Sequence, residues 1–361
     1  MTVPPPAAEE VRVMLCDDSA TTRAILARIL EGEPGIRVVH RAGNGQAALE
    51  ALPLTRPDVV LLDLEMPVMD GMTALPLILK AAPRAAVIVA SALTQRGAKA
   101  AIAALAAGAA DYVPKPQGAA GGAADPGFRA ELLAKVRGWA RMKRREGTAP
   151  APRLPTPPPR ALPPASRARP ALVAIGCSTG GPQALATLVK RLPRLPVPVV
   201  LVQHMPAGFT TMLAEHLDRL GPNRCAEAQD GEALSAGRIH LAPGDRHLLV
   251  EATAAGLRAR LTTDPPVNFC RPAVDPMLRS VVQACGGKLL AVILTGMGQD
   301  GLEGCRAVTA AGGTVLAQDE ASSVVWGMPG AVARAGLAAQ LAPPEALAER
   351  IAALAAERII A

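Results

Sequence analysis

Residues 171–182 read ALVAIGCSTGGP, an apolar run that leads directly into a serine within a glycine-rich turn. Residues 171–175 predict a buried strand, and the apolar spacing of residues 182–192 predicts a helix with a proline in its first turn. Backbone N–H groups at a helix N-terminus bind negative charge, either on a phosphate or on an oxyanion that forms during a reaction. The stretch therefore predicts an α/β domain in which Ser178 is a nucleophile or part of a phosphate cradle.

The composition limits the class of protein. The chain has 361 residues, of which 50% are hydrophobic and only 2% aromatic. This length fits two or three domains, and so few aromatic residues argue against stacking on single-stranded nucleic acid. The formal net charge of +7 is concentrated in residues 137–169, which indicates a solvated tether rather than a nucleic-acid-binding face. We expect a cytoplasmic protein without membrane insertion, because no apolar run is long enough to span a bilayer. We also expect a monomer.

The order of strands and helices predicts two α/β domains joined by a tether. We expect a disordered N-terminus at residues 1–10, a first domain at 11–146, a linker rich in proline and arginine at 147–170, and a second domain at 171–361. Strands that alternate with helices imply a parallel sheet covered on both faces. The expected strands of the first domain are residues 11–16, 37–41, 59–63, 87–90 and 111–113, and its expected helices are residues 20–31, 45–52, 72–82, 98–107 and 128–145. The expected strands of the second domain are residues 171–175, 197–203, 238–241, 247–251, 289–295 and 313–318.

Acidic side chains follow the strands of the first domain. Asp17 and Asp18 end the first strand, Asp63 ends the third, Ser91 follows the fourth and Lys115 follows the fifth. In a parallel sheet these positions lie together at the carboxyl edge, where ligands bind. Three carboxylates in one place favour Mg²⁺, and an aspartate beside Mg²⁺ can accept a phosphoryl group while lysine and serine contact the transferred oxygens.

The motifs around these residues resemble the receiver domain of two-component response regulators. They are LCDDS at 15–19, DLEMPVMDG at 63–71, SA at 91–92 and PKP at 114–116. The resemblance implies a flavodoxin-like fold with a five-stranded parallel sheet, in which Asp63 is phosphorylated. It also implies that Mg²⁺ is held by Asp17, Asp18, Asp63 and the Glu65 carbonyl. By the same resemblance, Ser91, Lys115 and Tyr112 sense the phosphate, with Tyr112 as the aromatic switch residue.

In the second domain, three strands deliver a hydroxyl, an imidazole and a carboxylate to one edge. Ser178 follows the first strand, His204 follows the next, and Asp300 follows a later strand through a glycine-rich turn. Serine attacks poorly unless a base takes its proton, and a carboxylate holds the imidazole in the required tautomer. His240 and His247 lie near the same edge and are rivals to His204, and Cys177 is a rival nucleophile.

Two other interpretations of the glycine-rich turn remain open from the residues alone. Gly176-x-Ser178-x-Gly180 matches the nucleophile elbow of α/β-hydrolases, but there the order of the triad is Ser, Asp, His. A dinucleotide site is disfavoured, because the full glycine spacing is missing and His204, rather than an acidic residue, ends the next strand.

The motifs of the second domain resemble the catalytic domain of the chemotaxis protein-glutamate methylesterase/protein-glutamine glutaminase family. They are GCSTGG at 176–181, QHMP at 203–206, LAPG at 241–244, DPM at 275–277 and TGMGQDG at 295–301. The resemblance implies a doubly wound, mostly parallel α/β domain. It also implies Ser178 as nucleophile, His204 as base and Asp300 as orienting acid, with Thr179 and Met297 lining the site and no cofactor there.

The resemblance further implies a function in chemotactic adaptation. A chemotaxis histidine kinase would phosphorylate the receiver, and the enzyme would hydrolyse glutamate γ-methyl esters on methyl-accepting chemoreceptors and deamidate their glutamines. A regulator of a non-flagellar chemosensory array is an alternative, as is a non-catalytic scaffold. A DNA-binding output domain would need a basic recognition helix, which residues 171–361 do not display.

Overall fold

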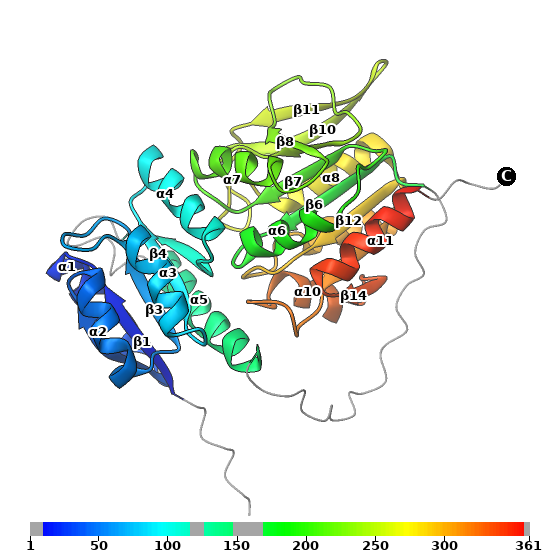
Figure 1. The fold of residues 1–361 in the computed structure, drawn as a ribbon. Helices are drawn as coiled ribbons and strands as arrows, with labels where there is room; N and C mark the ends of the chain where they lie inside the picture. The colour runs from blue at the N-terminus through cyan, green and yellow to red at the C-terminus, as the bar shows by residue number, and fades with distance from the viewer. Residues whose placement is uncertain (1–9, 116–125, 147–168, 357–361) are drawn as a thin grey trace, which may run out of the picture. The chain divides into compact units, whose positions relative to one another are not determined.

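The computed structural model describes residues 10–115, 126–146 and 169–356. The chain forms two compact units, residues 1–152 and 153–361 (Figure 1). Nearly all of the predicted disordered N-terminus, residues 1–10, and of the predicted linker, residues 147–170, lies outside the described residues. Within the described residues, no helix is both long enough and apolar enough to cross a membrane.

The first unit contains a five-stranded parallel sheet in the order β2-β1-β3-β4-β5. The central strand β3 is buried along its whole length, as its four consecutive apolar residues predict for a strand with both faces covered. The predicted five-stranded parallel fold is confirmed. The strands are β1 (Val11–Cys16), β2 (Ile36–Ala42), β3 (Val59–Asp63), β4 (Ala86–Ser91) and β5 (Asp111–Pro114).

Side-chain caps fix where four helices of this unit begin. Ser19, Asn44, Asp70 and Thr94 each accept a hydrogen bond from the backbone N–H three residues later, which satisfies an otherwise unpaired donor. The helices are α1 (Ala20–Glu31), α2 (Gly45–Thr55), α3 (Gly71–Ala81), α4 (Gln95–Ala106) and α5 (Pro126–Glu146).

The second unit contains a seven-stranded sheet in the order β14-β13-β12-β6-β7-β9-β8, and every neighbouring pair is parallel. A separate antiparallel hairpin, β10 and β11, packs beside helix α8. The strands are β6 (Leu172–Cys177), β7 (Val199–Gln203), β8 (Arg224–Glu227), β9 (Arg238–Leu241), β10 (His247–Thr253), β11 (Gly256–Thr262), β12 (Leu289–Ile293), β13 (Thr314–Gln318) and β14 (Gln340–Ala342).

Helices cover this sheet in two groups. Helix α6 packs against α11 (Figure 1). Helix α8 packs against α9. The chain runs from β6 to β7 in one direction and from β12 to β13 in the other, so right-handed crossovers place α6 and α9 on opposite faces. The helices are α6 (Gly181–Arg191), α7 (Phe209–Asp218), α8 (Val274–Cys285), α9 (Leu302–Ala310), α10 (Met328–Arg334) and α11 (Pro344–Ala356).

One hydrophobic core of the second unit lies between its sheet and α8. Val274, Met277, Leu278 and Val281 of that helix are fully buried against leucine, alanine and isoleucine side chains of β6 and β12. Aliphatic residues fill this core, as the low aromatic content requires. The packing leaves the carboxyl ends of the strands free to carry polar side chains.

Candidate functional site

In each sheet the chain adds strands on one side of the first strand and then on the other side. The candidate site residues lie next to the first strand, where this direction reverses. In the second unit the reversal falls between β6 and β12, the usual place for a ligand site in an open α/β sheet. Cys177 pairs with Gln203, and Gly176 pairs with Ile293. This register brings the ends of β6, β7 and β12 level, so the residues that follow them meet at one edge.

The turn that carries Ser178 can be built only with glycine at two positions. Gly180 has a φ of 75°, which side chains rarely adopt, and a Cβ at Gly181 would lie 1.9 Å from Gln203 Oε1. The Ser178 N–H donates to the Thr295 carbonyl at 3.0 Å, which ties the turn to the loop after β12. Ser178 is therefore held in place by its backbone, and its side chain is half-buried.

Gln203 joins the serine turn to the histidine. Its amide Nε2 donates to the Ser178 carbonyl at 3.0 Å and to the His204 carbonyl at 3.1 Å. Its Oε1 contacts the Cys177 thiol at 3.1 Å, and the side chain is buried. Gln203 lies in a motif that the sequence analysis used, but its bridging role has no signature in the sequence.

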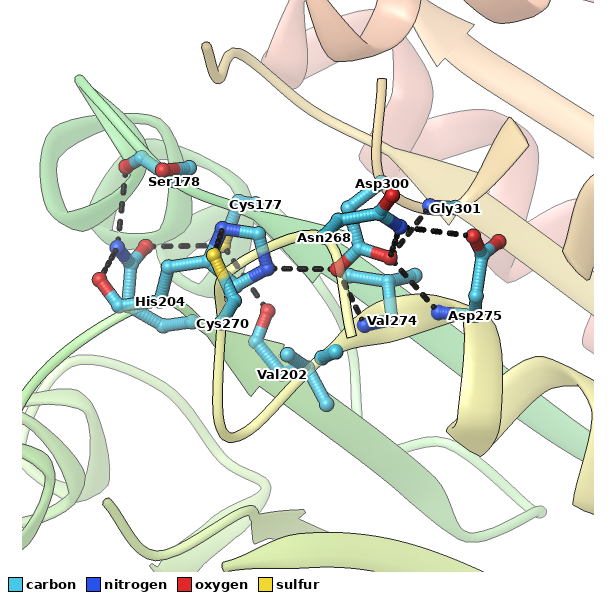
Figure 2. Close-up of polar contacts among 12 residues, drawn as sticks. Cys177, Ser178, Val202, His204, Asn268, Cys270, Val274, Asp275, Asp300 and Gly301 are labelled. Carbon is cyan, nitrogen blue, oxygen red and sulfur yellow. Dashed lines mark hydrogen bonds and ion pairs between the residues drawn. The ribbon is translucent and has the colours of Figure 1, made fainter. Parts of the chain in front are cut away.

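His204 and Asp300 are in direct contact. His204 Nε2 lies 2.8 Å from Asp300 Oδ2, and both side chains are nearly buried (Figure 2). The backbone N–H groups of Val274, Asp275 and Gly301 all donate to the same carboxylate. These donors fix the orientation of Asp300, and through it the orientation of the imidazole ring.

A further donor to Asp300 comes from Asn268, which the sequence analysis did not single out. Its Nδ2 lies 2.9 Å from Asp300 Oδ1 and 3.0 Å from Asp275 Oδ2. Asn268 precedes α8 in a loop without strand or helix periodicity, so no sequence pattern indicates it. Its amide group therefore donates to both neighbouring carboxylates, Asp275 and Asp300, and bridges them.

The contacts of His204 change its acidity. Burial opposes the imidazolium charge, but the hydrogen bonds with Asp300 and Cys270 outweigh burial and raise the pKa of His204 to about 10. Burial also opposes the charge of Asp300, while His204 and the surrounding donors lower the pKa of that carboxyl below its usual value. The pair therefore favours an imidazolium beside a carboxylate.

The second ring nitrogen of His204 faces a thiol. His204 Nδ1 lies 3.4 Å from Cys270 Sγ, and Figure 2 shows the imidazole between Cys270 and Asp300. Within the described residues, Ser178 Oγ makes no hydrogen bond with His204. Catalytic hydrogen bonds are often formed only when substrate is present, so the geometry is that of a resting site.

The rival side chains have other partners. His240 is buried and contacts Glu232 at 2.7 Å, while His247 contacts the Pro265 carbonyl and the Ala273 N–H. The Cys177 thiol is buried beneath the turn, and burial raises its pKa. Of these histidines, the structure joins only His204 to Asp300 within the described residues.

Thr179 and Met297 border the serine. A Cβ at Gly296, the residue before Met297, would lie 2.9 Å from Ser178 Cβ, so the two turns are in contact. Among the described residues, neither the Thr179 N–H nor the Met297 N–H has a hydrogen-bond acceptor. Two such donors beside a serine suit the binding of an oxyanion.

In the first unit, three carboxylates and a lysine meet where the strand order reverses, between β1 and β3. Oxygens of Asp17, Asp18 and Asp63 all lie within 4.8 Å of one another. Lys115 Nζ lies 2.6 Å from Asp63 Oδ2 and 3.2 Å from Asp17 Oδ2. Burial raises the pKa of Asp63, and the nearby lysine opposes that shift.

These residues fit a divalent cation. Oδ2 of Asp17 and Oδ2 of Asp63 are buried, and Lys115 Nζ forms an ion pair with both of them. Carboxylate oxygens with free lone pairs beside a third, exposed carboxylate match the ligands that Mg²⁺ prefers. The Glu65 N–H donates to Asp63 Oδ1 at 3.1 Å, which places the Glu65 backbone beside this cluster.

The other predicted receiver residues lie around this cluster. The Ser91 hydroxyl is buried and donates to the Gly97 carbonyl at 2.7 Å rather than toward Asp63. Tyr112 is buried, and Lys135 Nζ lies 4.6 Å from the centre of its ring. Lys135 is also buried and forms ion pairs with Asp111 and Glu131. No sequence pattern in α5 indicates these two ion pairs.

Family models match both units. A model described as response regulator receiver domain matches residues 13–121, and one described as CheB methylesterase matches residues 173–351. A receiver joined to a methylesterase domain defines a response regulator whose output is an enzyme. The chain belongs to the protein-glutamate methylesterase/protein-glutamine glutaminase family and is a carboxylic ester hydrolase.

Relatives support this assignment over the full length. A protein-glutamate methylesterase/protein-glutamine glutaminase of Paramagnetospirillum magneticum is 50% identical over 98% of this chain and 99% of its own. One from Azospirillum brasilense is 50% identical over 93% of this chain and 90% of its own. The crystal structure of the Thermotoga maritima CheB methylesterase catalytic domain is 41% identical, with a TM-score of 0.50 over 51% of this chain and 98% of that domain.

Proposed function

We propose that Ser178, His204 and Asp300 form the catalytic triad of a methylesterase that acts on chemoreceptors in the cytoplasm. The observation that carries the proposal is the 2.8 Å contact between His204 Nε2 and Asp300 Oδ2, beside a serine in a fixed glycine turn. With Nε2 held by Asp300, Nδ1 is the nitrogen that takes the serine proton.

The reaction then has two steps of acyl transfer. Ser178 Oγ attacks the γ-carbonyl carbon of a glutamate methyl ester, and its proton passes to His204 Nδ1. The carbon–oxygen bond to the methoxy group breaks, and methanol leaves with that proton. Water then gives a proton to Nδ1 while its oxygen attacks the acyl carbon. The bond from that carbon to Ser178 Oγ breaks, Oγ takes the proton back from Nδ1, and glutamate is released.

The unpaired backbone donors next to the serine complete the site. The N–H groups of Thr179 and Met297 bind the oxyanion of each tetrahedral intermediate. The same steps convert a glutamine side chain to glutamate, with ammonia in place of methanol as the leaving group. The relatives are named for both activities, so we propose that this chain has both.

We also propose that the receiver controls the esterase through phosphorylation of Asp63 by a chemotaxis histidine kinase. Asp17, Asp18, Asp63 and the Glu65 carbonyl would hold Mg²⁺, which supplies positive charge next to the incoming phosphoryl group. Lys115, already in contact with Asp63, stabilises the phosphorylated side chain. The phosphorylated state raises the esterase rate and thereby adjusts receptor methylation during adaptation.

Methanol release from methylated receptor tests the proposed chemistry. The full-length protein is incubated with receptor membranes carrying radiolabelled methyl esters, and volatile methanol is counted. Ser178→Ala is expected to remove release, whereas Ser235→Ala, a change at an exposed serine, retains it. Release by Ser178→Ala at the wild-type rate would contradict the triad, and no release by the wild-type protein would favour a scaffold.

A further inference from the structure

An exposed aromatic side chain lies on the loop that contacts the histidine. Phe269 is fully exposed, whereas the other two phenylalanines of the chain, Phe128 and Phe209, are buried. An exposed phenylalanine loses the free energy of burial that the other two gain. Single exposed apolar residues are common on surfaces, so exposure alone does not indicate a binding role for Phe269.

The backbone holds Phe269 outward in a tight turn. The Val267 N–H donates to the Cys270 carbonyl and the Cys270 N–H donates to the Val267 carbonyl, at 3.1 and 2.9 Å. The two residues between them, Asn268 and Phe269, both have positive φ, 52° and 62°. A two-residue turn of this type favours glycine at the second position, where Phe269 stands instead. The chain therefore keeps a large side chain in a strained conformation.

Both neighbours of Phe269 contact the proposed triad. Asn268 donates to Asp300, and Cys270 lies against His204 Nδ1. The turn is thus tied to Asp300 on one side and to His204 on the other, so the backbone of Phe269 has a fixed position beside these two residues. Met297, on the turn that borders Ser178, is a second partly exposed apolar side chain at this site.

We propose that Phe269 is a specificity-determining residue that binds an apolar side chain of the protein substrate close to the esterified glutamate. This inference rests on the proposed function and identifies what the enzyme recognises besides the ester. A small ester alone offers no group that reaches an outward-pointing side chain. A protein segment does, and a rigid aromatic ring contributes binding energy with little loss of side-chain entropy.

The test compares two substrates with the full-length protein. Methanol release from methylated receptor gives kcat and KM for the protein substrate. The rate at which a small fluorophosphonate labels Ser178 reports on the triad without a protein substrate. We expect Phe269→Ala to raise KM for methylated receptor about tenfold, with kcat and the labelling rate within twofold of wild type.

Three variants separate the side chain from the turn. Phe269→Gly removes the ring and relieves the strain, and we expect the same rise in KM. Phe269→Leu keeps apolar bulk and retains most of the affinity. Leu54→Ala, a control at an exposed leucine of the first unit, leaves KM unchanged. Wild-type KM in Phe269→Ala, or an equal loss of labelling and of methanol release, would overturn the inference. If the wild-type protein released no methanol from methylated receptor, the proposed function itself would be overturned.

Discussion

The Cys270 thiol lies 3.4 Å from His204 Nδ1, the ring nitrogen that Asp300 leaves free. If Nδ1 takes the serine proton, as we propose, the thiol and the serine compete for the same atom. Cys270 is half-buried, so it is within reach of solvent, and it lies on the same turn as Phe269. The resting site therefore holds its base in a contact that the reaction has to break.

Removal of this thiol changes the pH dependence of the esterase. Contacts with Asp300 and Cys270 raise the pKa of His204 to about 10, and the base must be unprotonated to act. Loss of one raising contact lowers that pKa, so the rising limb of kcat/KM against pH shifts to lower pH in Cys270→Ala. Methanol release measured from pH 6 to pH 10 checks this, and an unchanged or alkaline-shifted limb would argue against the contact.

Alkylation of Cys270 is expected to stop the reaction. An adduct on Sγ would occupy the space beside Nδ1 and prevent transfer of the serine proton. Cys285 is the other half-buried cysteine, and the remaining four are buried. N-ethylmaleimide is expected to inactivate wild type and Cys285→Ala equally, and to leave Cys270→Ala active. Inactivation of Cys270→Ala at the wild-type rate would place the sensitive thiol elsewhere.

Gln203 is expected to matter more for activity than for stability. In Gln203→Leu the Ser178 carbonyl keeps only the Gly181 N–H as donor, and the His204 carbonyl loses the donation from Gln203, at a cost of about 1–3 kcal/mol for a buried group left unpaired. Asn223→Leu is the matched control, since Asn223 is a buried amide that joins two backbone groups away from the site. Urea unfolding and methanol release are measured on both. Gln203→Leu should lose far more activity at a similar loss of stability, and equal activities would contradict a bracing role.

Phosphorylation provides a separate test of the receiver. Acetyl phosphate with Mg²⁺ is expected to stimulate methanol release by the wild-type protein, and addition of a chelator should remove the stimulation. Asp63→Asn should show no stimulation, because its amide lacks the carboxylate oxygen that would accept the phosphoryl group. Asp70→Asn is the control: Asp70 is exposed and caps α3, and asparagine caps helices equally well. Stimulation of Asp63→Asn would place the phosphoryl group on another residue.

The central part of each fold could be predicted because its local sequence signals, such as apolar runs and helix caps, agree with the structure. The strands at 11–16 and 59–63 and the helix at 20–31 have the predicted bounds, since apolar runs meet a side-chain cap at Ser19. Helix α4 begins three residues before its predicted start, because Thr94 caps it ahead of the apolar spacing. The short edge strands β8 and β14 were not predicted, and neither carries a run of apolar residues long enough to indicate a strand.

The residues of the candidate site that directly follow strands could be predicted from the sequence. Ser178, His204 and Asp300 follow strands that the sequence indicates, and the parallel sheet brings these strand ends together. Asn268 and Cys270 lie on a loop whose path depends on tertiary contacts, so no periodicity indicates them. Which nitrogen of His204 faces Asp300 depends on the rotation of one ring, which only the packed structure defines.

The assignment of the nucleophile is tested most directly by covalent labelling of the full-length protein with a fluorophosphonate, followed by peptide mass spectrometry. We expect a single adduct on Ser178, formed in step with the loss of methanol release and absent in His204→Gln. An adduct on Cys270, or full methanol release by protein labelled at Ser178, would contradict the account.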